Sequence, residues 1–417
     1  MSSDFQPLQG MHDITGDEVA HWQWLEQQAR SLFYRFGYTE LRTPILERQA
    51  LFLHSLGDTT DIVQKEMYAL EDRGGRSLAL RPEGTAGVMR HLAGLGEEGQ
   101  QMQCYYMGPM FRCERPQAGR KRQFHQIGVE SAGEANPLAD ASVIVLQLEL
   151  LKTWGLENIT IRVGTRGAAS DQEAIREGLR TAFSEKRDQF CEDCQRRIDE
   201  NVLRVMDCKN EACQALLRSL PTPSDFLSAE AKAYHDAVLS ALEDLHIDVK
   251  SDPSLVRGLD YYEQTIWEIE HTALGAQSAL AGGGRYRIKL GKKEVQGVGF
   301  AVGVERIAAV LEQQGWPAML THSDKPIFWL VSLGEEALKE NMSLALTLRS
   351  AGYRVGMEVV VKSMKAQLRK AGRFKATHAV IRGEDELNKG TVVVKNLVES
   401  QQNELPFNEW LKNLEGA

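Results

Sequence analysis

The stretch FRCERPQAGRKRQFHQIGVE, residues 111–130, gathers arginine, lysine and glutamine around one short loop, and it decides how the rest of the chain is interpreted. Apolar and aromatic residues alternate with charged ones in CYYMGPMFRCE (104–114) and in QFHQIGVES (123–131), which predicts two strands. The residues between them, RPQAGRKR (115–122), would then form a basic hairpin loop. Pairing of the strands would bring polar residues from both into one neighbourhood.

The composition limits the kind of protein. The chain has 417 residues, of which 42% are hydrophobic and 26% charged, and this suits a globular protein of two or three domains. Its formal net charge of -9 argues against a general polyanion binder, so a nucleic-acid partner would need a local basic patch. The first residues, MSSDFQPLQGMHD, lack a charged segment followed by an apolar one, and no window is apolar enough for a membrane span. We therefore expect a cytoplasmic protein without a membrane partner.

On both sides of the hairpin, the sequence pattern predicts further helices and strands. Apolar residues recur at helical spacing over residues 17–37, and a glycine ends the run. The alternating segment YTELRTPILE (38–47) contains a proline, which suits a sheet edge or the end of a strand. SLALRPEGTAGVMRHLAG (77–94) predicts a strand, a turn and a helix, and a helix over 136–153 leads into the strand NITIRVG (158–164).

The domain organisation follows from two changes in the pattern. Residues from about 168 to 250 are helical, highly charged and cysteine-bearing, as in an insertion or a subdomain. From residue 325 onward, strands and helices alternate, which predicts a small parallel or mixed α/β domain. We expect a first domain over residues 1–322, which includes the insertion, and a second over residues 325–417.

The segment between the insertion and the second domain is strand-rich. YYEQTIWEIEH (261–271) has a strand pattern, and VQGVGFAVGVERIAAVLEQQG (295–315) reads as a strand that enters a helix. The glycine run AGGGRY (281–286) lacks the GxGxxG spacing of a dinucleotide site. A tight turn, close backbone packing and a substrate-facing role all remain open for it.

Four separated segments carry cations and hydrogen-bonding groups. They are RPEGT (81–85), the hairpin (111–130), LVRGLDYY (255–262) and GVERIAAV (303–310). Arginine has a permanent charge and a planar fork that matches phosphate oxygens, so Arg112, Arg257 and Arg306 together indicate a polyphosphate ligand. For any one of these arginines, a surface salt bridge is the competing interpretation. No GxxxxGK[ST] loop is present in the sequence.

Four of the six cysteines cluster in the expected insertion. They are Cys191, Cys194, Cys208 and Cys213. The first pair has the CxxC spacing of zinc sites, whereas the second is stretched to CxxxxC. A structural zinc site and four free thiols both remain open.

These segments together carry a resemblance to a family. The hairpin resembles motif 2 of the class II aminoacyl-tRNA synthetases in its histidyl-tRNA synthetase form, GFAVGVERI (299–307) resembles motif 3, and GYTELRTPILE (37–47) resembles motif 1. LVRGLDYY and AGGGRY resemble the two signature segments of that family. KEMYALED (65–72) with RSLALRPEGTAGVMR (76–90) is similar to its amino-acid-binding stretch. The segments LGEEA, KAQLRKA and AVIRGEDELNKGTVVVKNL are similar to its anticodon-binding domain.

The resemblance implies a fold and an activity. The fold would be α/β of the α+β kind: a mixed, largely antiparallel sheet flanked by helices, a helical insertion and a C-terminal α/β anticodon-binding domain. The activity would be that of an ATP-dependent histidine–tRNA ligase, with ATP, L-histidine and tRNA(His) as partners, Mg²⁺ bound with ATP, and a homodimer built on motif 1.

The resemblance also implies roles for residues that match the motifs. For ATP, Arg112 would hold the α-phosphate, Glu114 would lie near the adenine amine, Phe124 would stack on adenine, and Arg306 would face the γ-phosphate. The histidine site would comprise Glu83, Gly84, Thr85, Arg112, Gln126, Glu130, Arg257, Tyr261 and Tyr262. The catalytic cations would be Arg257 and Arg112. The tRNA acceptor end would meet Arg115, Gln117, Arg120 and Lys121.

Physical chemistry agrees with part of this assignment. A carboxylate such as Glu130 and a phenol such as Tyr262 can pair with the two nitrogens of an imidazole, and a wrong amino acid would leave one of them unpaired. A second basic segment, KSMKAQLRKAGRFK (362–375), contains no acidic residue and would place a cationic helix face on tRNA phosphates, or else a solvated surface.

The sequence differs from the usual pattern of the family in three places, and two alternative functions compete with the one that the resemblance implies. Arg287 and Ile288 follow AGGGRY where the family usually has Asp-Gly, and VGTRG (163–167) and GMHD (10–13) also differ from the common pattern. One rival is a non-catalytic histidine-binding paralogue, such as a regulatory subunit of ATP phosphoribosyltransferase. It would be expected to lose Arg257 and the second domain, which are both present. The other rival is a synthetase for another amino acid, which would not need a polar pocket floor.

Overall fold

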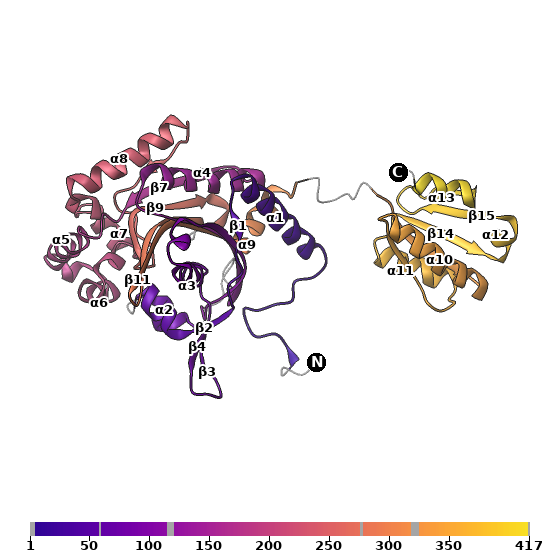
Figure 1. Ribbon diagram of the computed structural model, residues 1–417, viewed down its shortest axis with the longest axis horizontal. Coiled ribbons are helices and arrows are strands. Elements are labelled where there is room, and N and C mark those ends of the chain that lie inside the picture. Colours follow the sequence, from indigo (N-terminus) through magenta and orange to yellow (C-terminus); the bar gives the residue numbers. More distant parts are fainter. Residues whose placement is uncertain (1–4, 58–59, 115–120, 276–277, 318–324, 416–417) are drawn as a thin grey trace. The chain divides into compact units, whose positions relative to one another are not determined.

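The computed structural model describes residues 5–57, 60–114, 121–275, 278–317 and 325–415. The chain forms two compact units, Met1–Pro317 and Ala318–Ala417 (Figure 1). In the described ranges, no helix combines the length and the apolar character needed to cross a bilayer.

An eight-stranded sheet forms the centre of the first unit. Its strands, in spatial order, are β1 (Thr39–Glu40), β5 (Gln103–Phe111), β6 (Gln123–Ala132), β11 (Lys293–Gly303), β10 (Ala279–Leu290), β9 (Tyr262–His271), β7 (Ile159–Thr165) and β8 (Lys250–Ser251). Neighbours are antiparallel except at the two edges, where β1 and β8 pair in parallel with β5 and β7. The expectation of a mixed, largely antiparallel sheet is confirmed.

Helices cover both faces of this sheet and bury its apolar side chains. On one face, the core contains residues of α1 (Gly16–Arg35), α4 (Pro137–Thr153) and α9 (Val304–Gln314). On the other face, α2 (Gln49–Leu56) and α3 (Thr85–Leu95) pack into the concave side of the curved sheet, where Figure 1 shows α3 enclosed by the strands. A small antiparallel sheet of β2 (Leu46–Arg48), β4 (Ser77–Leu80) and β3 (Ala69–Glu71) lies beside α2.

The strand register brings distant parts of the sequence together. In the hairpin, Gly108 on β5 lies opposite Gln126 on β6. The other edge of β6 pairs with β11, so Gln126 lies opposite Gly303 and Glu130 opposite Gly299. Motif 2 and motif 3 are therefore neighbouring strands.

The glycine run lies inside the central strand β10, so its interpretation as a tight turn is wrong and close backbone packing is correct. Gly282, Gly283 and Gly284 pair with β9 on one side and β11 on the other. A side chain at any of them would collide with a neighbour, because a Cβ at Gly283 would lie 2.3 Å from the carbonyl oxygen of Gly299. Such positions accept only glycine without a shift of the backbone.

Beside the β7 edge, a group of short helices builds a separate small core. They are α5 (Gln172–Ser184), α6 (Glu192–Glu200), α7 (Glu211–Leu217) and α8 (Ala229–Asp244). Leu179, Phe183 and Ile198 are among its buried residues, together with three of the clustered cysteines.

The second unit is a five-stranded sheet flanked by helices. Its strand order is β13 (Arg354–Met357), β12 (Ile327–Leu333), β14 (His378–Gly383), β15 (Thr391–Asn396) and β16 (Gln402–Pro406). The first three strands are parallel and the last two antiparallel. Its helices are α10 (Glu335–Ser350), α11 (Met364–Arg373), α12 (Glu384–Lys389) and α13 (Phe407–Glu415).

The second basic segment of the sequence contains α11. Part of its charge is neutralised inside the unit, because the carboxylate of Glu358 contacts Lys370 at 2.6 Å and Lys362 at 3.8 Å. The segment therefore has fewer unpaired cations than the sequence suggests. Its two interpretations, a tRNA-facing surface and a solvated helix, both stay predictions.

Candidate active site

The first unit contains a cavity of about 1310 Å³, which is lined by residues from the segments that the sequence analysis identified. Arg112 of the hairpin, Arg257 of the loop before β9 and Arg306 of α9 all line it. All three arginines therefore line one cavity, and their roles there stay predictions. Further predicted residues that line the cavity are Glu83, Thr85, Glu114, Phe124, Gln126, Glu130, Tyr261 and Tyr262.

A network of buried acidic and hydroxyl groups forms the floor of the cavity. The carboxylate of Glu83 accepts hydrogen bonds from the amides of Thr85 and Ala86, each at 2.7 Å, where α3 begins. The hydroxyl of Thr85 donates to Oε1 of Glu130 at 2.7 Å. Burial raises the pKa of Glu83, against the effect of its hydrogen bonds.

Glu130 is the most perturbed acid of this floor. It is 1% exposed, and burial raises its pKa to about 8, although the hydrogen bond from Thr85 and the nearby hydroxyl of Tyr286 act in the opposite direction. Gly299 leaves room for its second oxygen, because a Cβ there would lie 2.1 Å from Oε2. A strongly perturbed carboxyl group in a cavity is typical of a functional site.

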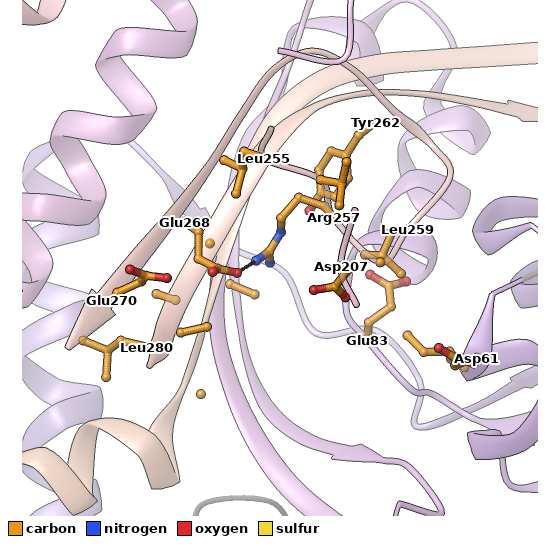
Figure 2. Close-up of a pocket in the computed structure, with 18 of the residues that line it drawn as sticks. Asp61, Glu83, Asp207, Leu255, Arg257, Leu259, Tyr262, Glu268, Glu270 and Leu280 are labelled. Carbon is orange, nitrogen blue, oxygen red and sulfur yellow. Dashed lines mark hydrogen bonds and ion pairs between the residues drawn. The ribbon is translucent and has the colours of Figure 1, made fainter. Parts of the chain in front are cut away.

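The wall above the floor is built from the segment around Arg257. Nη1 of Arg257 donates to Oε2 of Glu268 at 2.5 Å, and Figure 2 shows this pair with Tyr262 beside it. Burial lowers the pKa of Arg257, but Tyr262 and Glu268 outweigh burial and keep the pKa above its usual value. The rings of Tyr261 and Tyr262 meet edge to face with centroids 4.8 Å apart.

The glycine run makes room for these side chains. A Cβ at Gly282 would lie 2.7 Å from the guanidinium carbon of Arg257, and a Cβ at Gly284 would lie 2.7 Å from the ring of Tyr262. Gly84 has the same function below, because a Cβ there would lie 2.2 Å from the ring of Tyr106. The glycines thus set the depth of the cavity.

The hairpin supplies a cation beside an aromatic ring. Nε of Arg112 donates to the carbonyl of Pro82 at 2.9 Å, and Nη1 lies 3.9 Å from Glu114. Its guanidinium carbon lies 5.2 Å from the ring centroid of Phe124. This arrangement presents a charge next to a flat surface, which suits a phosphate joined to a base.

The start of α9 is tied to the hairpin. Glu305 accepts hydrogen bonds from the amide of His125 at 3.0 and 3.1 Å and lies 3.2 Å from its ring nitrogen. Nη1 of Arg306 donates to the carbonyl of Ala279. Arg306 is therefore held between α9 and β10 at the edge of the cavity.

Several carboxylates that line the cavity were missed by the sequence analysis, among them Glu268, Glu270 and Glu305. Glu268 pairs with Arg257, Glu270 pairs with Arg162 at 3.0 Å, and Glu305 binds the hairpin backbone. The alternation in β9 was a usable signal, because residues two apart on a strand share a face. The residues that these acids contact, in contrast, depend on the tertiary fold and have no local signal in the sequence.

The residues expected to meet tRNA are only partly described. Arg115, Gln117 and Arg120 lie outside the described residues. Lys121 lines the cavity, and its Nζ lies 2.9 Å from Nε2 of His12, which belongs to the GMHD segment.

The other sequence departures are accommodated by local pairing. Arg287 contacts Glu263 at 3.0 Å and Glu294 at 2.5 Å, and Ile288 is buried in the core beside α2 and α3. Arg166, within VGTRG, is buried, and burial lowers its pKa to about 10.

The four clustered cysteines also converge, with their sulfur atoms all within 4.8 Å of one another.

The comparisons with known proteins agree with this geometry. A family model described as histidyl-tRNA synthetase matches residues 10–307, and a model described as an anticodon-binding domain matches residues 328–416.

Relatives match over nearly the whole chain. The histidine–tRNA ligase of Anoxybacillus flavithermus is 42% identical over 418 residues, covering 98% of this chain and 98% of the relative. That of Geobacillus thermodenitrificans is 43% identical and covers 97% of this chain and 96% of its own. The crystal structure of the apo histidyl-tRNA synthetase of S. aureus matches with a TM-score of 0.80 at 30% identity, over 99% of this chain and 100% of that chain. The chain belongs to the histidyl-tRNA synthetase family.

Proposed function

We propose that this chain is a histidine–tRNA ligase, which activates L-histidine with ATP to give histidyl-adenylate and pyrophosphate and then transfers histidine to the 3′ end of tRNA(His). The observation that carries the proposal is the convergence of Arg112, Arg257 and Arg306 on the cavity that also holds the buried Glu130 and Tyr262. A polyphosphate and an imidazole are the ligands that such a combination would select.

In the first step, an oxygen of the histidine carboxylate attacks the α-phosphorus of ATP. A new P–O bond forms, and the bond to pyrophosphate breaks with its electron pair on the leaving oxygen. Arg257 and Arg112 act as the catalytic cations that stabilise the negative charge on the α-phosphate oxygens. Glu268 is a positioning residue, because its contact with Arg257 aims the guanidinium into the cavity.

The floor of the cavity selects histidine. Glu130 and Tyr262 pair with the two imidazole nitrogens, with the ring of Tyr261 beside them. Glu83, Thr85 and Gln126 receive the α-amino group. In support, the side-chain oxygen of Gln126 is buried and accepts no hydrogen bond from the described part of the chain.

ATP lies along the hairpin. Phe124 stacks on adenine, Glu114 lies near its amine, and Arg306 faces the γ-phosphate. Mg²⁺ bound with ATP would offset the negative charge of the phosphates. The cavity fits this ion, because Glu268, Glu270 and Glu305 supply carboxylate oxygens at its lining, and Mg²⁺ needs only one or two of them beside phosphates and water.

The second step uses the basic side of the hairpin. Arg115, Gln117, Arg120 and Lys121 contact the acceptor end of tRNA, and residues 325–417 bind the anticodon. A protein that charges tRNA for translation is expected to work in the cytoplasm.

The chain works as a homodimer. Motif 1 and the helix before it expose several large apolar side chains: Tyr34, Phe36, Ile45 and Leu46. Tyr34 is 83% exposed, which is unusual for a ring in a helix of the core and supports coverage by a second copy. Light scattering coupled to size-exclusion chromatography should give twice the chain mass of 46.7 kDa. A single-chain mass at micromolar concentration would contradict the dimer.

The test of the function is ATP–pyrophosphate exchange with each of the twenty amino acids. Exchange with histidine alone supports the ligase. Exchange with a different amino acid would reassign the specificity, and histidine binding without exchange would identify a sensor paralogue. Both of these outcomes would contradict the proposal. Exchange with a different amino acid would mean that the floor of the cavity does not select histidine. Histidine binding without exchange would mean that the arginines do not catalyse activation.

A further inference from the structure

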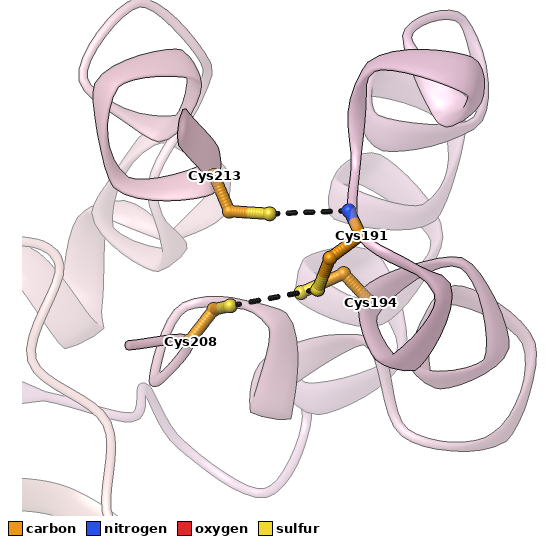
Figure 3. A group of neighbouring side chains, drawn as sticks. All are labelled: Cys191, Cys194, Cys208 and Cys213. Carbon is orange, nitrogen blue, oxygen red and sulfur yellow. Dashed lines mark hydrogen bonds between the residues drawn. The ribbon is translucent and has the colours of Figure 1, made fainter. Parts of the chain in front are cut away.

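The clustered cysteines lie in the helical insertion, outside the residues that the proposed reaction uses. Cys191 precedes α6 and Cys194 lies in its first turn, whereas Cys208 follows the short 3₁₀ helix Val202–Val205 and Cys213 lies in α7. Three of the four are buried, and Figure 3 shows all four side chains pointing toward a common centre.

The spacing of the sulfur atoms fits a tetrahedron. Ligand sulfurs about 2.3 Å from a zinc ion lie roughly 3.8 Å from one another at the corners of a tetrahedron. The sulfurs of Cys191 and Cys208 are 3.9 Å apart, and all four sulfurs lie within 4.8 Å. The set is thus a slightly expanded version of a Cys₄ zinc site, and none of the four is in a disulfide.

Backbone amides point at these sulfurs. The amide of Cys191 donates to Sγ of Cys213 at 3.2 Å, and the amide of Asn210 donates to Sγ of Cys208 at 3.4 Å. Amide donors stabilise thiolates, which are the form that binds a metal.

Four thiolates within 4.8 Å of one another repel each other and need positive charge at their common centre. A divalent ion would supply that charge at the common centre. Four soft sulfur ligands in a tetrahedron favour zinc over magnesium or calcium.

We propose that Cys191, Cys194, Cys208 and Cys213 bind one structural zinc ion as four thiolates. All four positions of a tetrahedral ion are then filled by protein, so the ion holds structure and takes no substrate. The stretched CxxxxC spacing, which made the sequence match imperfect, is bridged by the first turn of α7, where Asn210 caps the helix through Cys213.

The ion would add a cross-link to the small hydrophobic core of the insertion. Helices α6 and α7 are short, and the side chains of Cys194, Cys208 and Cys213 are part of the small core of the insertion. A small core of this kind is often completed by a metal. The ion would join α6, the turn at Cys208 and α7 in a single cross-link.

The same cross-link lies behind the wall of the cavity. Asp207, Cys208 and Lys209 line that cavity. Arg204, four residues before Cys208, forms an ion pair with Asp61 and packs on Gly258, next to Arg257. This part of the inference depends on the proposed function: the zinc would fix the wall that faces the reacting phosphate.

The first experiment measures zinc in the full-length protein, purified without chelator or affinity metal, by plasma mass spectrometry. We expect one zinc per chain. Replacement by Co²⁺ should give the sulfur-to-metal charge-transfer and d–d absorption of a tetrahedral thiolate site. A protein that contains no zinc and takes up neither Zn²⁺ nor Co²⁺ in the reduced state would overturn the proposal, as would a disulfide among the four cysteines in freshly prepared protein.

A matched pair of variants assigns the site. Cys208→Ser should lose the zinc and melt at a lower temperature, whereas Cys113→Ser, at an exposed cysteine outside the cluster, should keep it. If Cys208→Ser does not fold, chelation of the unmodified protein replaces it: zinc release should accompany a lower melting temperature. Loss of zinc from Cys113→Ser but not from Cys208→Ser would contradict the assignment. Because zinc content does not depend on exchange activity, failure of the ligase assay leaves this test standing.

Discussion

Two arginines pack on opposite faces of strand β10, in opposite kinds of surroundings. On the face away from the cavity, Arg285 contacts Asp140 at 2.6 Å, and the two side chains are 1% and 0% exposed. Asp140 also accepts a hydrogen bond from Tyr234 at 2.9 Å, and Arg285 donates to the carbonyl of Gly133. On the cavity face, Arg257 packs against Gly282 and contacts Glu268, and its Nε finds no partner in the described ranges.

The charge of Arg285 is paired within the fold and has a structural role. The charge of Arg257 lies beside a cavity and is positioned for a ligand. A buried pair whose polar atoms are matched within the fold contributes to the specific packing of the sheet. Polar groups that remain partly unmatched beside a cavity, such as Arg257 and Gln126, are positioned for a molecule that enters it. Loss of the first kind should lower stability, and loss of the second kind should lower activity.

The largest effect is expected on the structural face. Arg285→Ala leaves the carboxylate of Asp140 buried and uncompensated, which should lower the free energy of unfolding by about 3–5 kcal/mol in urea titrations. The double variant Arg285→Met with Asp140→Leu should recover much of this loss, because no lone charge remains. A single variant as stable as the parent protein would remove the contrast between the two faces.

The next effect concerns catalysis. Arg257→Ala should reduce histidine-dependent ATP–pyrophosphate exchange about 10²–10³-fold, because a positioned cation is lost from the transition state. The fold should stay intact, since Glu268 remains 19% exposed to the cavity. Arg257→Lys keeps the charge without the planar fork and should regain part of the rate. Normal exchange by the alanine variant would refute the assigned role.

A smaller effect is expected for the amino-acid pocket. Tyr262→Phe removes one partner of the imidazole and should lower kcat/KM for histidine by about 1–3 kcal/mol, or roughly 5- to 150-fold, mainly through KM. The matched control is Tyr234→Phe, whose hydroxyl bonds Asp140 on the other face. That variant should lose about 1 kcal/mol of stability and keep its KM. Equal histidine KM values for both variants would place the imidazole elsewhere.

Per pH unit, the smallest effect is the dependence of stability on pH. The folded pKa of Glu130 is raised from 4.5 to about 8, so the folded ligand-free protein binds a proton that the unfolded chain releases. This contribution is therefore complete below pH 4.5 and is lost as pH rises to about 8, at no more than about 1.4 kcal/mol per pH unit. Glu130→Gln should flatten that slope in urea titrations across this range. Identical slopes for both proteins would show that Glu130 is already ionised.

The sequence predicted those parts of the molecule in which the signal is local. The hairpin, the strand–turn–helix around Glu83 and the strand–helix at Arg306 are read from alternation and helical spacing, and the structure has each of them. The resemblance to a family then supplied the grouping of the arginines, which no local pattern contains.

What the sequence could not predict depends on partners far away in the chain. Glu268 and Glu305 were overlooked because each is defined by its contact, with Arg257 and with the hairpin backbone. The glycine run could not be placed in a strand, since its glycines have low strand propensity and are fixed there by Arg257 and Tyr262. The basic helix α11 seemed fully cationic because Glu358, which pairs with Lys370, precedes the segment.

The strand order of the large sheet has a consequence for synthesis on the ribosome. β6 pairs on one edge with β5, which is made just before it, and on the other with β11, which is made only after residues 133–292. The nascent hairpin therefore waits with an open hydrogen-bonding edge while the insertion and β9 are still being translated. Chaperone occupancy should accordingly be greatest in that interval and fall once β11 has emerged from the exit tunnel.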